Sequence, residues 1–222
     1  MAPAAVLFDA GHTLIEPRDQ ALAEAARAAG LPVSATAIAR AFRLAIRALN
    51  LAPPADPPQP FRPLVAQELA RLGAGGRDAE AAFWAVLDQY NAAHTLWTKP
   101  VEGALATLAE LKRRNIRTAV VSNSDGHVVH YLAQAGLLPL LDVVVDSEVV
   151  GVEKPDQRIF RHALEKLAVE PSGVPFVGDR YDVDVLGART VGMRGLLYDP
   201  EGGEPPGVCE VLRRLEALLD LL

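Results

Sequence analysis

The sequence predicts a doubly wound α/β fold that carries a separate all-helical insert. Two observations lead to this prediction. After residue 98, short apolar runs alternate with longer segments of helical periodicity, the pattern of strands buried on both faces of a parallel sheet. The segment 16–98 has no strand-like run and is dominated by Ala- and Leu-rich helical patterns. We therefore predict a mostly parallel, Rossmann-like sheet made by residues 1–15 and 99–222, with a helical domain, 16–98, inserted after its first strand.

The predicted strands are the short, unalternating apolar runs of the sequence. They cover residues 5–8, 118–122, 143–145, 174–177 and 195–198. Helical periodicity predicts the helices of the same domain at 101–115, 126–135, 156–168, 182–191 and 208–221. Terminal signals support three of these bounds, because Asp125 is a plausible N-cap, Gly136 a plausible C′ residue, and Pro155 suits the first position of the next helix.

The insert is predicted to consist of helices divided by a Pro-rich break. Helical patterns occupy residues 19–30, 35–50, 62–72 and 77–96, and the break is "APPADPPQP" at 52–60. Pro17 and "TKP" at 98–100 are expected hinges to the rest of the chain. Trp84, Tyr90 and Trp97 are expected to pack on the apolar faces of these helices.

The composition excludes several classes of function. Of 222 residues, half are hydrophobic, and the net charge of −6 argues against a nucleic-acid partner. The single cysteine, Cys209, excludes an internal disulfide and any multi-Cys metal site, and its place in a predicted helix favours packing. The start, "MAPAAVLFD", lacks the features of a signal peptide, and no run approaches the roughly 20 apolar residues of a membrane span. We expect a cytoplasmic protein without a membrane partner.

Residues that can carry chemistry follow four of the predicted strands. They are Asp9 in "FDAGHTL", Ser122 and Asn123 in "VVSNSDG", Lys154 in "GVEKPD", and Asp179, Asp182 and Asp184 in "VGDRYDVDV". In doubly wound sheets ligands bind beyond the carboxyl ends of the strands, so these side chains should converge. Clustered carboxylates need a cation, and oxygen-only ligands suit Mg²⁺. A lysine and a hydroxyl would bind phosphate oxygens, while a carboxylate facing the phosphorus can attack it and form an acyl phosphate.

These four motifs, in this order, resemble those of the haloacid dehalogenase-like (HAD) hydrolase superfamily. The resemblance covers the whole α/β part, and the insert lies where members with a small helical cap carry theirs. It implies a catalytic pair, Asp9 as nucleophile and Lys154 as charge neutraliser, a phosphate-binding set, Ser122, Asn123 and Lys154, and a Mg²⁺ site of Asp9, the backbone carbonyl of Gly11, Asp179 and Asp184. The resemblance thus implies a Mg²⁺-dependent phosphatase that acts on a small phosphorylated metabolite through an aspartyl-phosphate.

The chain departs from the family's phosphatase pattern at Gly11. Phosphatases of this superfamily usually read Asp-x-Asp, and the second Asp serves as general acid and base, a contribution typically of about 10²–10⁴-fold in rate. Gly11 has no side chain for this role. His12 is a candidate substitute, because imidazole titrates near neutral pH.

Two further readings of the departure stay open, and one is rejected. Dehalogenases of the superfamily also lack the second Asp, since a halide leaves without a proton, although they work without Mg²⁺ and typically lack the acidic pattern at 179–184. The second open possibility is a weakly catalytic or non-catalytic protein that binds a phosphoryl ligand. Phosphonate cleavage needs a cap lysine, and residues 16–98 contain none.

Two features have more than one expected role. Asp182 is expected either to support the metal ligands or to lie in the first turn of a helix. The apolar tail "VLRRLEALLDLL" is expected to pack on the core, with pairing to another subunit as the alternative. Either a monomer or a homodimer is therefore compatible with the sequence.

Overall fold

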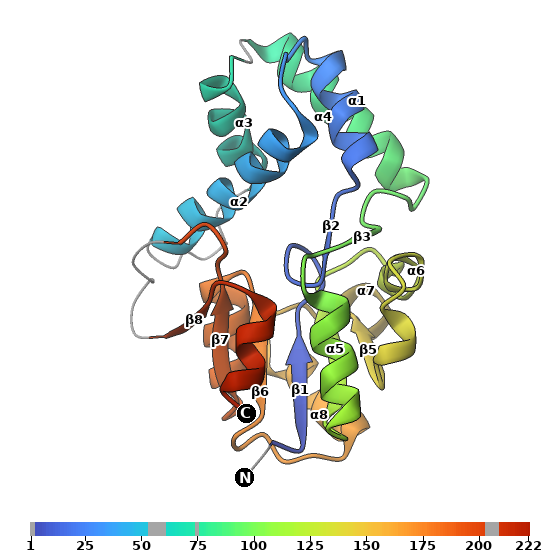
Figure 1. Ribbon diagram of the computed structural model, residues 1–222, viewed down its shortest axis with the longest axis vertical. Coiled ribbons are helices and arrows are strands. Elements are labelled where there is room, and N and C mark those ends of the chain that lie inside the picture. Colours follow the sequence, from blue (N-terminus) through green and yellow to red (C-terminus); the bar gives the residue numbers. More distant parts are fainter. Residues whose placement is uncertain (1–2, 53–60, 74–75, 203–208) are drawn as a thin grey trace. The chain divides into compact units, whose positions relative to one another are not determined.

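The computed structural model describes residues 3–52, 61–73, 76–202 and 209–222, which form two compact units (Figure 1). The first unit combines the N-terminal strand, as far as Ile15, with the chain from Pro100 onward, and the second is Glu16–Lys99. The Pro-rich break expected at 52–60 lies, apart from Ala52, outside the described residues. Each unit is described by itself below.

The first unit is built on a parallel sheet, which confirms the predicted fold class. In the described part of the chain its strands are β1 (Ala5–Phe8), β4 (Arg117–Ser122), β5 (Val143–Asp146), β6 (Pro175–Gly178), β7 (Arg194–Tyr198) and β8 (Glu210–Leu212). Their order is β5-β4-β1-β6-β7-β8, and every neighbouring pair is parallel. This is the Rossmann order, in which the chain leaves β1 in one direction and returns to its other side. The switch between β1 and β6 is where such sheets bind ligands.

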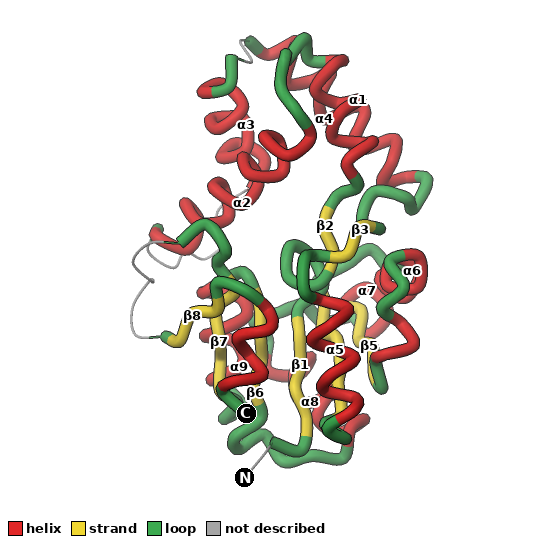
Figure 2. The backbone as a smooth tube through the Cα atoms, in the orientation of Figure 1, coloured by secondary structure: helices red, strands yellow, loops and turns green. Residues whose placement is uncertain are grey.

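Helices cover both faces of this sheet. They are α5 (Ala104–Arg113), α6 (Val128–Gln134), α7 (Ser147–Val150), α8 (Gln157–Leu167) and α9 (Leu186–Arg189), with 3-10 turns at Leu138–Leu140 and Leu215–Asp220. Figure 2 shows α5 and the C-terminal turn on one face, and α8 and α9 on the other. Ile159 and Phe160 of α8 are fully buried in one core cluster with strand residues such as Phe176. The strands are apolar throughout because both of their faces are buried.

Three predicted helix details differ from the structure, and one is confirmed. The N-cap of α6 is His127, and Asp125 instead accepts a hydrogen bond from the His127 N–H at 3.2 Å. Pro155 does not occupy the first position of α8, because Asp156 is the N-cap and accepts from the Arg158 N–H at 2.9 Å. Gly136 directly follows the C-cap of α6 with φ 74°, as predicted for a C′ glycine.

The predicted helix 208–221 is the third difference. Its first part is the edge strand β8, which pairs with β7 from Glu210 to Leu212, and only Leu215–Asp220 is helical, as a 3-10 turn. The exposed edge of β7 offers backbone partners that outweigh the local helical periodicity. Leu215 and Leu218 are fully buried in the same unit, so the apolar tail packs on the core, the expected default.

The second unit contains four helices in its described residues. They are α1 (Asp19–Ala28), α2 (Ala35–Leu51), α3 (Phe61–Arg71) and α4 (Arg77–Ala92), close to the predicted bounds. Their apolar faces form one core in which Phe42 contacts Phe83 and Trp84. Trp84, Tyr90 and Trp97 are partly buried against this core, as expected. The helices are stable together because each buries one stripe of small and apolar residues.

The chain enters and leaves the helical unit through two short strands that pair with each other, β2 (Ile15–Glu16) and β3 (Lys99–Pro100). The Lys99 ammonium lies 2.9 Å from carboxylate oxygens of both Glu16 and Asp19. The entry and exit strands are therefore joined by backbone pairing and by ion pairs.

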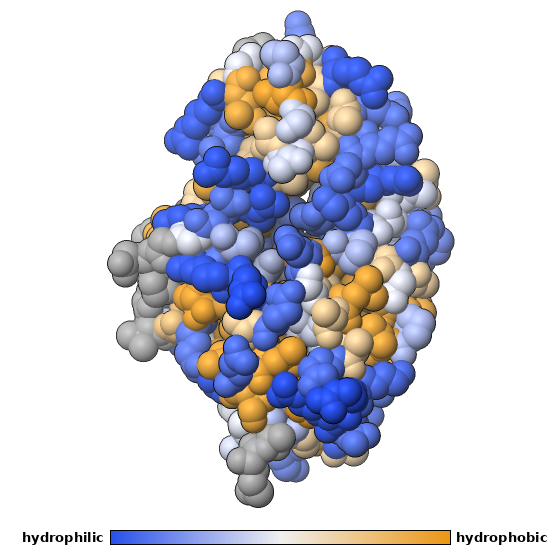
Figure 3. Space-filling model, in the orientation of Figure 1, coloured by the Kyte–Doolittle hydropathy of each residue, from blue (hydrophilic) through white to orange (hydrophobic). Residues whose placement is uncertain are grey.

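Several large hydrophobic side chains are exposed on the described surface. They are Leu51, Leu105, Val129, Val149 and Leu221. On the visible face of each unit in Figure 3, hydrophobic side chains lie among hydrophilic ones. Scattered exposure of this kind is normal for globular proteins. Among the helices described, none has the length and apolar character needed to cross a bilayer.

Candidate active site

A buried lysine bridges two carboxylates at the carboxyl edge of the sheet. Asp9 directly follows β1, and its Oδ1 accepts a hydrogen bond from Lys154 Nζ at 2.5 Å. The same ammonium donates to Asp184 Oδ1 at 2.7 Å. The side chains of Lys154 and Asp184 are only 2% and 1% exposed. Residues 9, 154 and 184, far apart in the sequence, thus meet at one place, as the motif positions predicted.

Asp179 completes a group of three buried carboxylates. One oxygen from each of Asp9, Asp179 and Asp184 lies within 4.8 Å of the others. Asp179 follows the end of β6, the strand that pairs with β1. When all are ionised, their three negative charges face the Lys154 ammonium and the more distant Arg180, which is already paired with Asp182. Oxygen donors with excess negative charge are what Mg²⁺ requires, so these residues fit that ion.

Burial and the neighbouring charges together shift the pKa values of the groups in the cluster. Burial raises the pKa of Asp9 to about 6, with Lys154 opposing the shift and Asp184 adding to it. Burial, together with the charges of Asp9 and Asp184, holds the pKa of Asp179 well above its usual range. Burial would lower the pKa of Lys154, but Asp184 and Asp9 outweigh it and raise that pKa above its ordinary value. Lys154 therefore stays protonated, and a further cation would relieve the carboxylates.

Gly178 makes room for Asp184 in this cluster. A Cβ on Gly178 would lie 2.4 Å from the Asp184 Cγ and 2.5 Å from its Cβ. A π-helical turn, Tyr181–Val185, returns Asp184 to the end of β6, where the Arg180 N–H donates to its Oδ2 at 3.0 Å. The glycine of the "VGD" motif is thus required by a close approach, and the turn fixes the carboxylate that meets Lys154.

Asp182, whose role was open in the sequence, does not join the carboxylate group. It lies in the first turn of the π-helical segment, and its carboxylate forms an ion pair with Arg180 at 2.9 Å. Its Oδ1 also accepts a hydrogen bond from the Val183 N–H at 3.0 Å. Asp182 therefore stabilises the turn that presents Asp184.

We expect the carboxylate group to hold Mg²⁺. Replacing Gly178 by Ala should then displace the Asp184 carboxylate and weaken Mg²⁺ binding by about 10–100-fold, the usual effect of disturbing the support of a metal ligand. The new methyl group would overlap the first atoms of the Asp184 side chain, which cannot swing away without moving the turn. Isothermal titration calorimetry with Mg²⁺ measures the change. Gly136→Ala is the control, because Gly136 has positive φ and open space around it, so it tests destabilisation alone. Equal affinities in the two variants would contradict the prediction.

Ser122 and Asn123, which are expected to bind phosphate, lie at the end of β4, the strand that pairs with β1. Ser122 is the last residue of β4 and is buried, and the register that pairs Phe8 with Val120 places it at the same edge as Asp9. In the structure the Asn123 side chain bonds the backbone of Lys154. Its Nδ2 donates to the Lys154 carbonyl oxygen at 3.0 Å, and its Oδ1 accepts from the Lys154 N–H at 2.7 Å.

Sequence reasoning missed two buried residues that hold the loop after β4. Asp146 Oδ1 accepts from the N–H groups of Gly126 and Glu148, and its Oδ2 from that of Val128, at 3.0–3.1 Å. Ser147 Oγ accepts from the Ser124 N–H at 3.0 Å. The available signal was an aspartate between the apolar run "VVV" and a short helix, the position of an N-cap.

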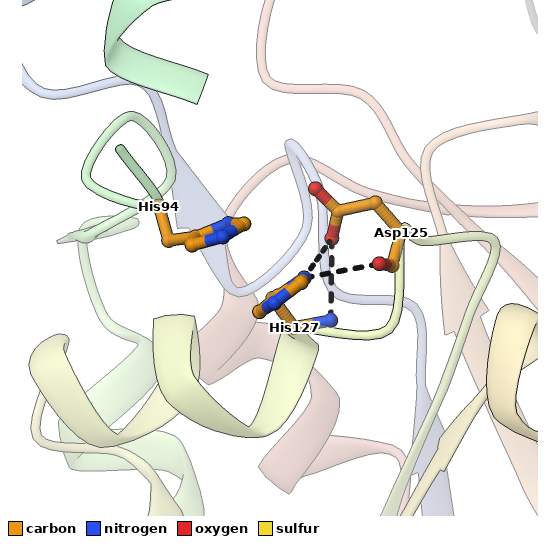
Figure 4. A group of neighbouring side chains, drawn as sticks. All are labelled: His94, Asp125 and His127. Atoms are coloured by element: carbon orange, nitrogen blue, oxygen red, sulfur yellow. Dashed lines mark hydrogen bonds and ion pairs between the residues drawn. The ribbon is translucent and has the colours of Figure 1, made fainter. Parts of the chain in front are cut away.

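Asp125 belongs to the local structure of the same loop. Its Oδ2 accepts from the Tyr131 hydroxyl at 2.7 Å, and Figure 4 shows its carboxylate and main chain turned toward His127. His127 Nδ1 lies 3.0 Å from the Asp125 carbonyl oxygen and 3.6 Å from its Oδ1. These contacts make Asp125 a stabiliser of the start of α6.

Gly11 and His12 lie in a tight turn that follows Asp9. Gly11 forms an isolated β-bridge with Ile15, and the His12 N–H donates to the Ile15 carbonyl oxygen at 2.7 Å. His12 adopts a left-handed backbone with φ 56°. The turn returns the chain sharply after Asp9, so the position that lacks a carboxylate lies only two residues from the proposed nucleophile.

Comparison with known proteins supports the family resemblance. The family model for haloacid dehalogenase-like hydrolases matches residues 3–192. A bovine (Bos taurus) haloacid dehalogenase-like hydrolase domain-containing protein 3 is 38% identical over 189 residues, 81% of this chain and 73% of the relative. A glyceraldehyde 3-phosphate phosphatase of Methanopyrus kandleri is 32% identical over 162 residues, 69% of each chain.

Solved structures share the fold. The HAD-hydrolase YfnB from Bacillus subtilis, solved bound to magnesium, matches with a TM-score of 0.66 and 20% identity over 100% of this chain and 99% of that one. Both phosphatases and dehalogenases are among the structures of this fold, so the fold does not choose between the two reactions. From its motifs, its fold and the match over residues 3–192, the chain belongs to the haloacid dehalogenase-like hydrolases.

Proposed function

We propose that this chain is a Mg²⁺-dependent phosphatase that hydrolyses a small phosphorylated metabolite through an aspartyl-phosphate on Asp9. The observation that carries the proposal is the buried group of Asp9, Asp179 and Asp184 around Lys154. A dehalogenase needs no divalent cation, and three buried carboxylates facing one ammonium would be an unfavourable design without one. The relatives named as phosphatases support the same reaction.

Each residue of the group has a role in this reaction. An Asp9 oxygen attacks the phosphorus, the ester P–O bond breaks, and the leaving oxygen takes a proton. Water then attacks the phosphorus of the aspartyl-phosphate and releases phosphate and the Asp9 carboxylate. Lys154 is a fixed positive charge for the phosphoryl oxygens, and the Ser122 hydroxyl donates to one of them.

Asp9, Asp179, Asp184 and the Gly11 carbonyl would hold Mg²⁺. When bound, that ion would neutralise charge on the phosphoryl group and on the carboxylates. The metal would also offset the burial and the repulsion that raise the pKa of Asp9 and Asp179, and so favour the ionised form of Asp9, which is the nucleophile.

We infer that the helical unit, Glu16–Lys99, is the cap of this enzyme, with the paired strands β2 and β3 as its connection to the sheet. A cap over such a site would exclude water and select the substrate. The chemical step on the ester needs an acid, and Gly11 supplies none. We propose that either His12 or a leaving group of low pKa meets this need.

The first test is hydrolysis of acetyl phosphate and p-nitrophenyl phosphate by the purified chain, with Mg²⁺ and with EDTA. Both compounds have good leaving groups, so they should be hydrolysed despite Gly11. Phosphate release that stops with EDTA and returns with added Mg²⁺ is the expected result. Chloride release from 2-chloropropionate, unaffected by EDTA, would instead establish a dehalogenase. Mg²⁺ binding by calorimetry without turnover of any of these compounds would favour a phosphoryl-ligand binding protein.

A further inference from the structure

One side-chain amide ties the end of β4 to the residue that carries the site's positive charge. Asn123 Nδ2 donates to the Lys154 carbonyl oxygen at 3.0 Å, and Asn123 Oδ1 accepts from the Lys154 N–H at 2.7 Å. The amide thus binds the N–H and the C=O of one residue, as a neighbouring strand would. Two bonds to the same residue fix both the place and the orientation of its backbone.

The loop that carries Asn123 is itself held by two side chains at the end of the neighbouring strand, β5. Asp146 and Ser147, 5% and 3% exposed, accept hydrogen bonds from backbone N–H groups of residues 124, 126 and 128. Ser147 Oγ also donates to the Ser124 carbonyl oxygen at 3.3 Å. Breaking these bonds would leave the buried side chains of Asp146 and Ser147 without partners, so the end of β5 sets the position of the loop that carries Asn123.

The position of the Lys154 ammonium depends on this backbone. A lysine has four rotatable side-chain bonds and reaches one point only if its Cα is held. Lys154 Nζ donates hydrogen bonds to Asp9 and Asp184 and lies 5.5 Å from the centre of the Phe176 ring. The Lys154 side chain is 2% exposed. A shift of the Lys154 backbone would be transmitted directly to the ammonium.

We propose that Asn123 is a positioning residue that holds Lys154 in place for the reaction, and that it does not bind the phosphoryl group. Both ends of its amide are engaged by the Lys154 backbone. A series of hydrogen bonds therefore links the end of β5 to the loop after β4, and that loop to the Lys154 backbone. The Lys154 side chain then carries its ammonium to the position between Asp9 and Asp184. The catalytic part of this inference rests on the proposed phosphatase function, whereas the tie to Lys154 does not.

The kinetic test compares Asn123→Ala, Asn123→Asp and Gln134→Ala. Removing the amide should lower kcat on acetyl phosphate about 10–100-fold, because a displaced Lys154 ammonium stabilises the reacting phosphoryl group less well. Asn123→Asp keeps the acceptor for the Lys154 N–H and should retain more activity than Asn123→Ala. Gln134, an exposed amide on α6, is the matched control and should behave as wild type. Loss of activity in Asn123→Ala while Lys154 keeps its wild-type protection from acetylation would overturn the proposal, because that pattern belongs to a side chain that binds phosphate directly.

A second readout does not depend on activity. The chain has only four lysines, Lys99, Lys112, Lys154 and Lys166, so acetylation by limiting acetic anhydride can be followed at each by mass spectrometry. Lys154 should be strongly protected in wild type and should react at least about tenfold faster in Asn123→Ala, relative to the exposed Lys112 and Lys166. An unchanged relative rate would overturn the tie. If wild type lacks phosphatase activity, the proposed function fails by itself, and the acetylation ratio still decides whether Asn123 holds Lys154.

Discussion

Asp9→Asn should abolish phosphate release from acetyl phosphate and p-nitrophenyl phosphate, lowering kcat by about 10⁴-fold or more, the scale on which loss of a covalent nucleophile acts in hydrolases. An amide oxygen is too weak a nucleophile to displace the leaving group. Binding should be less affected, because the amide has nearly the same shape and its oxygen can still accept from Lys154 Nζ, 2.5 Å from Asp9 Oδ1 in the wild type. Steady-state kinetics with saturating Mg²⁺ measures the loss.

The same substitution should leave the protein folded. In the metal-free protein the pKa of Asp9 is raised from 3.8 to about 6, so its ionisation opposes folding. That penalty develops as the pH rises from about 4 to 6 and is fully present at pH 7. Asn cannot ionise, so the free energy of unfolding at pH 7 without Mg²⁺ should be equal to or larger than that of wild type, measured by urea denaturation. Loss of activity therefore cannot be blamed on unfolding.

Asp156→Asn is the matched control for this experiment. Asp156 is an N-cap of α8 on the surface, where Asn caps about as well as Asp. This variant should keep wild-type kcat. Turnover of Asp9→Asn within tenfold of wild type, with stability retained, would contradict the assignment of Asp9 as nucleophile.

The meeting of these side chains could be predicted largely because most of them follow the ends of strands. Asp9, Ser122 and Asp179 each follow an apolar run that can hardly be anything but a buried strand, and parallel strands bring their carboxyl ends together. The structure brings Lys154 and Asp184 to Asp9, and a pattern of residue types was enough to expect it. The reason for Gly178 was not accessible, since a close approach between a glycine and a side chain six residues later depends on a π-helical turn.

Long-range polar contacts were harder to predict than the motifs. Asn123 was expected to bind phosphate, and its bonds to the Lys154 backbone join residues 31 positions apart. Asp146 and Ser147 carry no motif, and their role depends on the neighbouring strand pair. The helix predicted at 208–221 was wrong for a related reason. The periodicity of that segment is helical, but pairing with the edge of β7 makes Glu210–Leu212 a strand. Tertiary contacts decide such cases, and local pattern does not report them.

Gly11→Asp should raise the activity, and the gain should depend on the leaving group. The new carboxyl would lie two residues after Asp9, in the tight turn closed by the bridge to Ile15, where the family's phosphatases carry their acid. On an alkyl phosphate such as glycerol phosphate, whose alkoxide must be protonated, kcat should increase by about 10²–10⁴-fold. On acetyl phosphate, whose leaving group needs little protonation, formation of the aspartyl-phosphate should gain far less. The measurement is kcat on each substrate at saturating Mg²⁺, and the gain on the alkyl phosphate should be much larger than the gain on acetyl phosphate.

Gly11→Asn separates acid catalysis from a change in shape, because Asn has the size of Asp without a transferable proton. A gain confined to Asp means that the missing acid limits the natural enzyme. Equal effects of Asp and Asn, or no gain in a variant whose Mg²⁺ affinity is retained, would contradict this. His12→Asn, in which Asn tolerates the left-handed backbone at φ 56°, then locates the natural acid. If His12 serves, its loss should lower kcat on alkyl phosphates in the wild type but have a much smaller effect in Gly11→Asp, because the new carboxyl replaces it.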